Sequence, residues 1–232
     1  MIEQWGTVLA VVGMLAATLA AAAIANRLQA HQARVRDTVR RLDAGTAAIN
    51  DSLSLLARVP LSRELRLTLR GEVVARCQRI RSLARRTPGI EQRIRAAETA
   101  LQAEGGTVPG GVGPIENEQA FRRLVAALDD LLAVLQHGPL LQPVPADVRA
   151  IFTRELGERR AEVLARFHLV ESRRREEDGD LLRARAHITT LMHGLRQRGP
   201  STDFVRELYR EAESALSGLS QRHVGTPAEA AG

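Results

Sequence analysis

The chain has 232 residues, of which 44% are hydrophobic and only 3% aromatic, and its formal net charge is +6. All 33 basic residues are arginines, which excludes chemistry that depends on a P-loop, Schiff-base or other catalytic lysine. The single cysteine, Cys77, excludes an intrachain disulfide and is typical of a reducing compartment. Abundant alanine, leucine, arginine and glutamate, with few β-formers, predict an all-α fold.

The first predicted element is an uncharged run of 23 residues, 4–26, which lies between Glu3 and Arg27. As a helix it would be about 30 Å long, which matches the hydrocarbon core of a bilayer. We therefore expect a single transmembrane helix. A cleaved signal peptide fits less well, because the apolar run is long and no basic residue precedes it. A buried core helix also fits less well, because Trp5 and the basic flank have the positions of interfacial residues.

Positive charge follows this run. Residues 27–86 contain 14 arginines and five acidic residues. Because basic flanks stay on the cytoplasmic side, we expect 1–3 outside and the C-terminal domain in the cytoplasm, at a bacterial inner membrane. The arginines nearest the membrane are the predicted contacts for anionic lipid: Arg27, Arg34, Arg36, Arg40 and Arg41. A plain orientation signal and contact with nucleic acid are the alternatives for this segment.

A stripe of apolar residues runs along the predicted juxtamembrane helix, 27–59, at an interval of seven. Its members are Leu28, Val35, Leu42, Ile49 and Leu56. Such a stripe predicts helix association, either in a self-associating coiled coil or by packing on the chain's own domain. Both interpretations stay open from the sequence, and the first would make a homo-oligomer.

A helical hairpin is predicted over 60–103. Pro60 ends the preceding helix, Ser62 can cap the next one, and a Thr-Pro-Gly break at 87–89 separates two helices. Arginines are expected to cover the surface of the first of these helices. They are Arg63, Arg66, Arg70, Arg76, Arg79, Arg81, Arg85 and Arg86.

The rest of the chain is predicted to form a Gly/Pro linker, 104–116, a helical hairpin domain, 117–222, and a disordered tail, 223–232. Asn117 can cap the first helix of that domain. The expected architecture is thus a transmembrane helix that continues into a long helix, followed by a multi-helix bundle of antiparallel hairpins.

No arrangement of residues predicts catalysis. The six histidines lack metal-ligand spacing, and the closest pair in sequence, His187 and His193, does not share one helical face. Cys77 lies on an apolar helical face, as a buried thiol does. We expect no cofactor, no metal site and no enzyme activity.

The predicted function is a membrane-anchored adaptor, scaffold or assembly factor with a protein partner of unidentified nature. The alternative is a membrane-tethered protein that binds nucleic acid through 27–86.

Overall fold

In the computed structural model, residues 2–85, 87–105 and 111–224 are described, without the side chains of 2–13, 15–18, 20, 21 and 222–224. Over these residues the fold has seven α-helices, one 3-10 turn (Leu56–Arg58) and no strand. The all-α prediction is confirmed. The helices are α1 (Ile2–Leu55), α2 (Arg63–Leu83), α3 (Ile90–Gln102), α4 (Glu118–His137), α5 (Ala146–Glu177), α6 (Leu181–Arg198) and α7 (Asp203–Val224).

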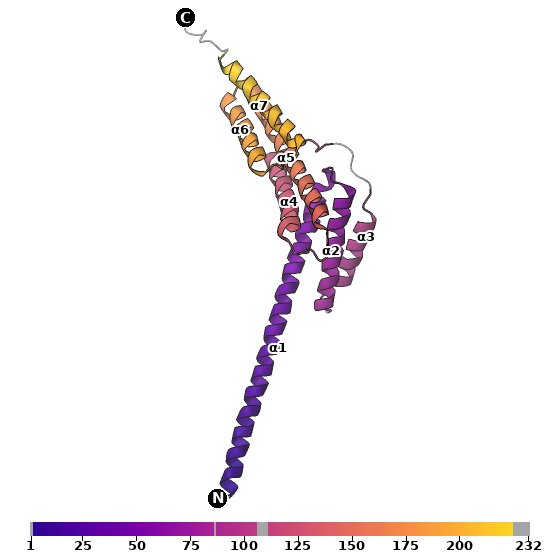
Figure 1. Cartoon of the computed structure of the whole chain (residues 1–232), viewed down its shortest axis with the longest axis vertical. Helices are drawn as coiled ribbons and strands as arrows, with labels where there is room; N and C mark the ends of the chain where they lie inside the picture. Colours follow the sequence, from indigo (N-terminus) through magenta and orange to yellow (C-terminus); the bar gives the residue numbers. More distant parts are fainter. Residues whose placement is uncertain (1, 86, 106–110, 225–232) are drawn as a thin grey trace.

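Helix α1 is one continuous element of 54 residues, about 80 Å long. Figure 1 shows it as a rod that projects from the rest of the molecule, with only its C-terminal part beside other helices. Described side chains from Ala22 to Ala33 are exposed, whereas Ile49 and Leu53 are buried. The same helix is therefore a free stem at one end and part of a core at the other.

The predicted transmembrane helix, 4–26, falls mostly outside the described side chains, which within it are those of Met14, Leu19 and 22–26. Among the residues that the structure describes, no helix is both long enough and apolar enough to cross a membrane. The structure thus gives the transmembrane prediction no support.

Helix α2 turns back along α1 after Pro60 (Figure 1). Its start is set locally, because the Ser62 hydroxyl accepts a hydrogen bond from Leu65 N at 3.3 Å. Cys77 and Ile80 near its other end cluster with Ile90 and Ile94 of α3, and Val39 and Leu42 of α1 pack against this cluster. The turn between α2 and α3 consequently lies beside the middle of α1, where Val39 and Leu42 are.

Two larger cores hold the helices together. The core that we call the α1 core combines the end of α1 with α2, α4 and the first half of α5. The core that we call the α7 core combines the second half of α5 with α6 and α7. Both predicted hairpin units, 60–103 and 117–222, contribute to the α1 core. Leu65 and Leu69 of the first unit belong to the same cluster as Leu128 and Leu131 of the second.

The predicted linker contains a buried position in its described part. Val112 is buried, and its backbone N–H donates to Glu162 Oε1 on α5 at 2.8 Å. This bond holds the described part of the segment against the middle of α5.

Candidate functional site

The five arginines predicted to contact lipid all lie on α1 with exposed side chains. Within the described residues, Arg27, Arg34, Arg36, Arg40 and Arg41 have no ion pair and no side-chain hydrogen bond. Their charge is therefore open to solvent and to an external anion.

The backward turn of α2 adds further charge to this stem. Arg79, Arg81 and Arg85 are exposed near the end of α2, beside the part of α1 that carries Val39 and Leu42. Two acidic residues here are engaged, because Arg93 binds Asp43 and Arg81 lies 3.5 Å from Glu91. We call these exposed arginines of α1 and α2 the basic collar.

Not every arginine of α2 reaches the surface, and for two of them the sequence-based expectation is wrong. Arg66 and Arg76 are 7% and 6% exposed. Arg66 Nε lies 2.8 Å from Glu104, and Arg70 bonds Asn50 through Nη1 at 2.7 Å. Arg66 and Arg70 lie on the face of α2 that packs on neighbouring segments, where acidic and amide partners outside α2 compensate their burial. Arg76 is instead paired within α2, with Glu72.

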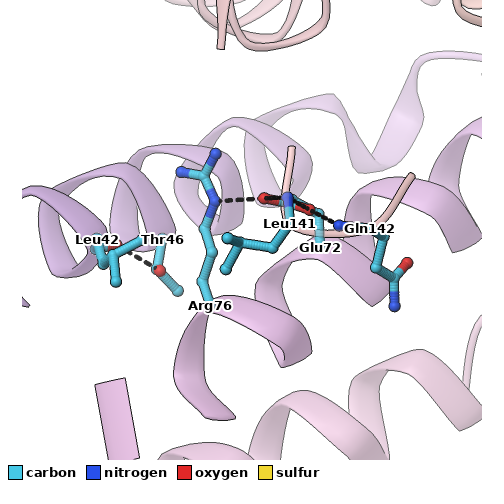
Figure 2. A network of polar contacts seen from close by, with 6 residues as sticks. All are labelled: Leu42, Thr46, Glu72, Arg76, Leu141 and Gln142. Atoms are coloured by element: carbon cyan, nitrogen blue, oxygen red, sulfur yellow. Dashed lines mark hydrogen bonds and ion pairs between the residues drawn. The ribbon is translucent and has the colours of Figure 1, made fainter. Parts of the chain in front are cut away.

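A buried carboxylate fixes α2 to the rest of the domain (Figure 2). Glu72 is 1% exposed and accepts a hydrogen bond from Arg76 Nε at 2.7 Å. The backbone N–H groups of Leu141 and Gln142 donate to Glu72 Oε2 at 2.9 and 3.1 Å. One side chain thus neutralises a buried arginine and satisfies two loop amides.

The same network packs against a glycine on α1. A Cβ added to Gly45 would overlap with Nη1 of Arg76, so the guanidinium fills the space that a side chain would occupy. The neighbouring Thr46 is buried, and its hydroxyl bonds Leu42 O at 2.6 Å (Figure 2). Glu72 and Arg76 therefore set how α1, α2 and the α4–α5 loop meet.

The predicted association stripe divides along α1. Ile49 and Leu56 are each 1% exposed and belong to the α1 core. Leu42 is half-buried against Cys77 and Ile80, Val35 is half-buried, and Leu28 is 58% exposed. The C-terminal part of the stripe packs on the chain's own domain, and only its first residue, Leu28, is fully exposed.

A groove runs beside the first three turns of α5. It has a volume of about 880 Å³ and lies between α4, the start of α5 and the α6–α7 turn. Three arginines line it, Arg149, Arg154 and Arg198, together with the hydroxyls of Thr153, Ser201 and Thr202. The residues that form its described walls include no acidic side chain. No sequence motif marks this groove, because its walls come from three separate segments.

The two histidines that contact each other are not the pair that is closest in the sequence. His168 on α5 and His187 on α6 bring their Nδ1 atoms to 3.1 Å, so that one ring donates to the other. Phe121 and Phe167 stack on each other beside this pair. Burial, and then the neighbouring His187, lower the pKa of His168 to about 4. The His168 ring is therefore neutral at neutral pH.

The described residues contain no group of three or more His, Cys, Asp or Glu side chains that could hold a metal ion. Cys77 is buried, and burial raises the pKa of its thiol, with Arg93 and Asp43 acting in opposite directions. A thiol in this state is a weak nucleophile.

Comparison with known proteins adds no family to these observations. The chain matches no protein-family model, and neither a curated protein nor a solved structure is significantly similar to it.

Proposed function

We propose that this protein is a membrane-anchored helical adaptor that acts through protein contacts on the cytoplasmic side of a bacterial inner membrane. The observation that carries the proposal is the exposed stem of α1. Side chains from Ala22 to Ala33 are exposed with respect to the rest of the described chain, and the uncharged run 4–26 directly precedes and overlaps this stem. A helix that continues beyond its domain in this way fits a tether better than a fold element.

The basic collar supports the membrane side of the proposal. Along α1, Arg27 lies immediately after the proposed anchor, and Arg41 lies about 20 Å further along the axis. The end of α2 returns toward the same region, so that its arginines face the bilayer within a few Debye lengths. Anionic headgroups would attract each such arginine by about 1 kcal/mol.

Contact with nucleic acid is less well supported by the same residues. Arg66 and Arg76 are buried, and Arg70 is occupied by Asn50 and Glu104. The charge left on the surface of 27–86 lies around a helical stem, without aromatic side chains for base stacking.

Two measurements test the proposal. A reporter fused after Gly232 should be active in its cytoplasmic form and silent in its periplasmic form, and the full chain should stay in the membrane pellet after a carbonate wash. Release by carbonate would rule out the anchor, and the reverse reporter pattern would rule out the orientation.

The adaptor role is tested by crosslinking the full chain in native membranes and purifying it under denaturing conditions. We expect discrete protein adducts that survive nuclease treatment. Adducts that disappear with nuclease would instead support the nucleic-acid alternative.

A further inference from the structure

We propose that the groove between α4, α5 and the α6–α7 turn is the docking site for an acidic segment of a protein partner. This inference rests on the proposed adaptor function and names the chemistry of the partner. For the argument below, we call this feature the arginine groove; its charged walls are Arg149, Arg154 and Arg198.

The charge of the arginine groove is largely uncompensated. Arg149 and Arg154 have no acidic partner among the described residues, and Arg149 Nε is shielded from solvent without a hydrogen-bond acceptor. Arg198 lies 3.7 Å from Asp129, which Arg160 already binds at 2.6 Å. A guanidinium with free donors binds carboxylates in a bidentate manner, which makes carboxylate the matching group.

The remaining lining suits a polypeptide. Apolar contact surface comes from Leu132, Val144, Ala150 and Pro200, and hydroxyl and amide groups alternate with it. The volume of about 880 Å³ exceeds what a single phosphate or carboxylate fills and accommodates several side chains. An acidic segment that also carries apolar residues would use both kinds of wall.

The surroundings of the groove disfavour a long polyanion. Acidic residues directly follow four of its lining positions in the sequence: Asp147 after Ala146, Glu155 after Arg154, Glu158 after Gly157 and Asp203 after Thr202. No aromatic side chain is among the described lining residues, so bases would find no stacking surface. The absence of a stacking surface favours an acidic peptide over nucleic acid as the occupant.

The groove is built as a defined site by the network around Glu72. Glu72 holds the backbone of Leu141 and Gln142, and Val144 two residues later forms part of the wall. On the opposite side, Gly157 allows α5 to approach Pro200 closely, since a Cβ there would lie 3.2 Å from Pro200 Cδ. Both walls are therefore fixed by buried contacts.

The test is a selection from a random peptide library on the full chain in detergent. We expect the recovered peptides to be rich in Asp and Glu with interspersed apolar residues. The double variant Arg149→Glu, Arg154→Glu should bind a recovered peptide at least tenfold more weakly by fluorescence anisotropy, about the effect of losing one charged pair. Replacing the acidic residues of that peptide by lysine should restore binding to the double variant.

Arg123→Glu is the matched control, because Arg123 is exposed on α4 and makes no ion pair within the described residues. It should leave peptide binding unchanged. Recovery of no peptides or of neutral or basic ones, or binding unaffected by the double variant, would overturn the inference. An oligonucleotide that displaces the peptide at equal charge would also overturn it and assign the groove to nucleic acid. Protein adducts in native membranes would still stand in each of these cases, so the adaptor proposal is decided separately.

Discussion

The helices around the two large cores of this protein are connected in different ways. Around the α1 core the connections are long, and three carboxylates from helices bind their backbone: Glu72 binds Leu141 and Gln142, Glu155 binds Ser62, and Glu162 binds Val112. Around the α7 core the connections are short, and their own side chains cap the helices that follow. Asp180 Oδ1 accepts from Arg183 N at 3.0 Å, and Thr202 Oγ1 accepts from Val205 N at 3.4 Å.

The difference follows from the obligation to satisfy buried backbone amides. A turn of a few residues can direct its N–H groups to its own cap, but a longer loop that packs on a core needs acceptors from outside. The α1 core therefore depends on long-range polar contacts, whereas the α7 core depends on apolar packing and one histidine pair. Four changes test this comparison, given from the largest expected effect on stability to the smallest.

Glu72→Ala should cause the largest loss, about 3–5 kcal/mol of unfolding free energy, because it leaves Arg76 buried without its counter-ion and two amides without an acceptor. The measurement is denaturant unfolding of the full chain in detergent. Glu98→Ala on α3 serves as the control and should cost less than about 1 kcal/mol. A loss of that small size for Glu72→Ala would show that the network contributes little to the α1 core.

The histidine pair should give the α7 core a dependence on pH. In the folded chain the pKa of His168 is lowered from 6.5 to about 4, mainly because burial disfavours the charged ring. Between these values the unfolded chain binds more protons than the folded chain, so stability is lost as the pH falls from 6.5 toward 4. The loss is at most about 3 kcal/mol.

His168→Leu removes this titration, so its unfolding free energy should fall less than that of the parent chain over the same pH range. His193→Leu is the control, because His193 is exposed on α6. An equal fall in the parent chain and in His168→Leu would mean that other groups set the acid sensitivity.

Glu155→Ala tests a single long-range contact, between Glu155 of α5 and Ser62. Its two oxygens accept the N–H and the hydroxyl of Ser62, at the start of α2. We expect a loss of about 1–2 kcal/mol, since one partly buried amide loses its acceptor while Ser62 can still cap α2. Glu158→Ala, one turn further along α5, should be nearly neutral by the same unfolding measurement. Equal effects of the two substitutions would refute a specific role for Glu155.

Local features of the fold were predictable and long-range ones were not. The caps at Ser62 and Asn117 are confirmed, because the Ser62 and Asn117 side chains accept from Leu65 N and Ala120 N. Such contacts depend on residues three apart. The bond from Leu141 to Glu72 joins residues 69 apart, and the His168–His187 contact joins residues 19 apart.

The same distinction explains one of the two errors about arginine, that for Arg66. Arg66 and Arg76 were expected on the surface, because arginine is rarely buried without a partner. The partner of Arg66, Glu104, lies outside α2 and gives no sign of that role in the sequence. The partner of Arg76, Glu72, is four residues earlier on the same helix, and that spacing is visible in the sequence. The arginine groove was missed for a related reason, since α4, α5 and the α6–α7 turn each contribute only part of it.

The smallest effect on stability is expected for the basic collar, whose residues belong to neither core. Replacing Arg34, Arg36, Arg40 and Arg41 by Gln should change the unfolding free energy by less than about 1 kcal/mol, because the four side chains are exposed and unpaired within the described chain. The helix content by circular dichroism should also stay the same.

The effect on lipid binding should be much larger. We expect a fragment of residues 27–232 to sediment with vesicles that contain anionic lipid, to be released by high salt, and to ignore neutral vesicles. The four replacements should weaken this binding by up to about 4 kcal/mol, at about 1 kcal/mol for each arginine near the surface. An equal number of exposed arginines far from the collar provides the control: Arg123, Arg173, Arg185 and Arg210. If both sets of replacements weaken binding equally, the attraction comes from net charge, and the collar has no separate role. If the fragment binds anionic and neutral vesicles alike, the collar does not contact lipid and its charge only sets the orientation of the chain.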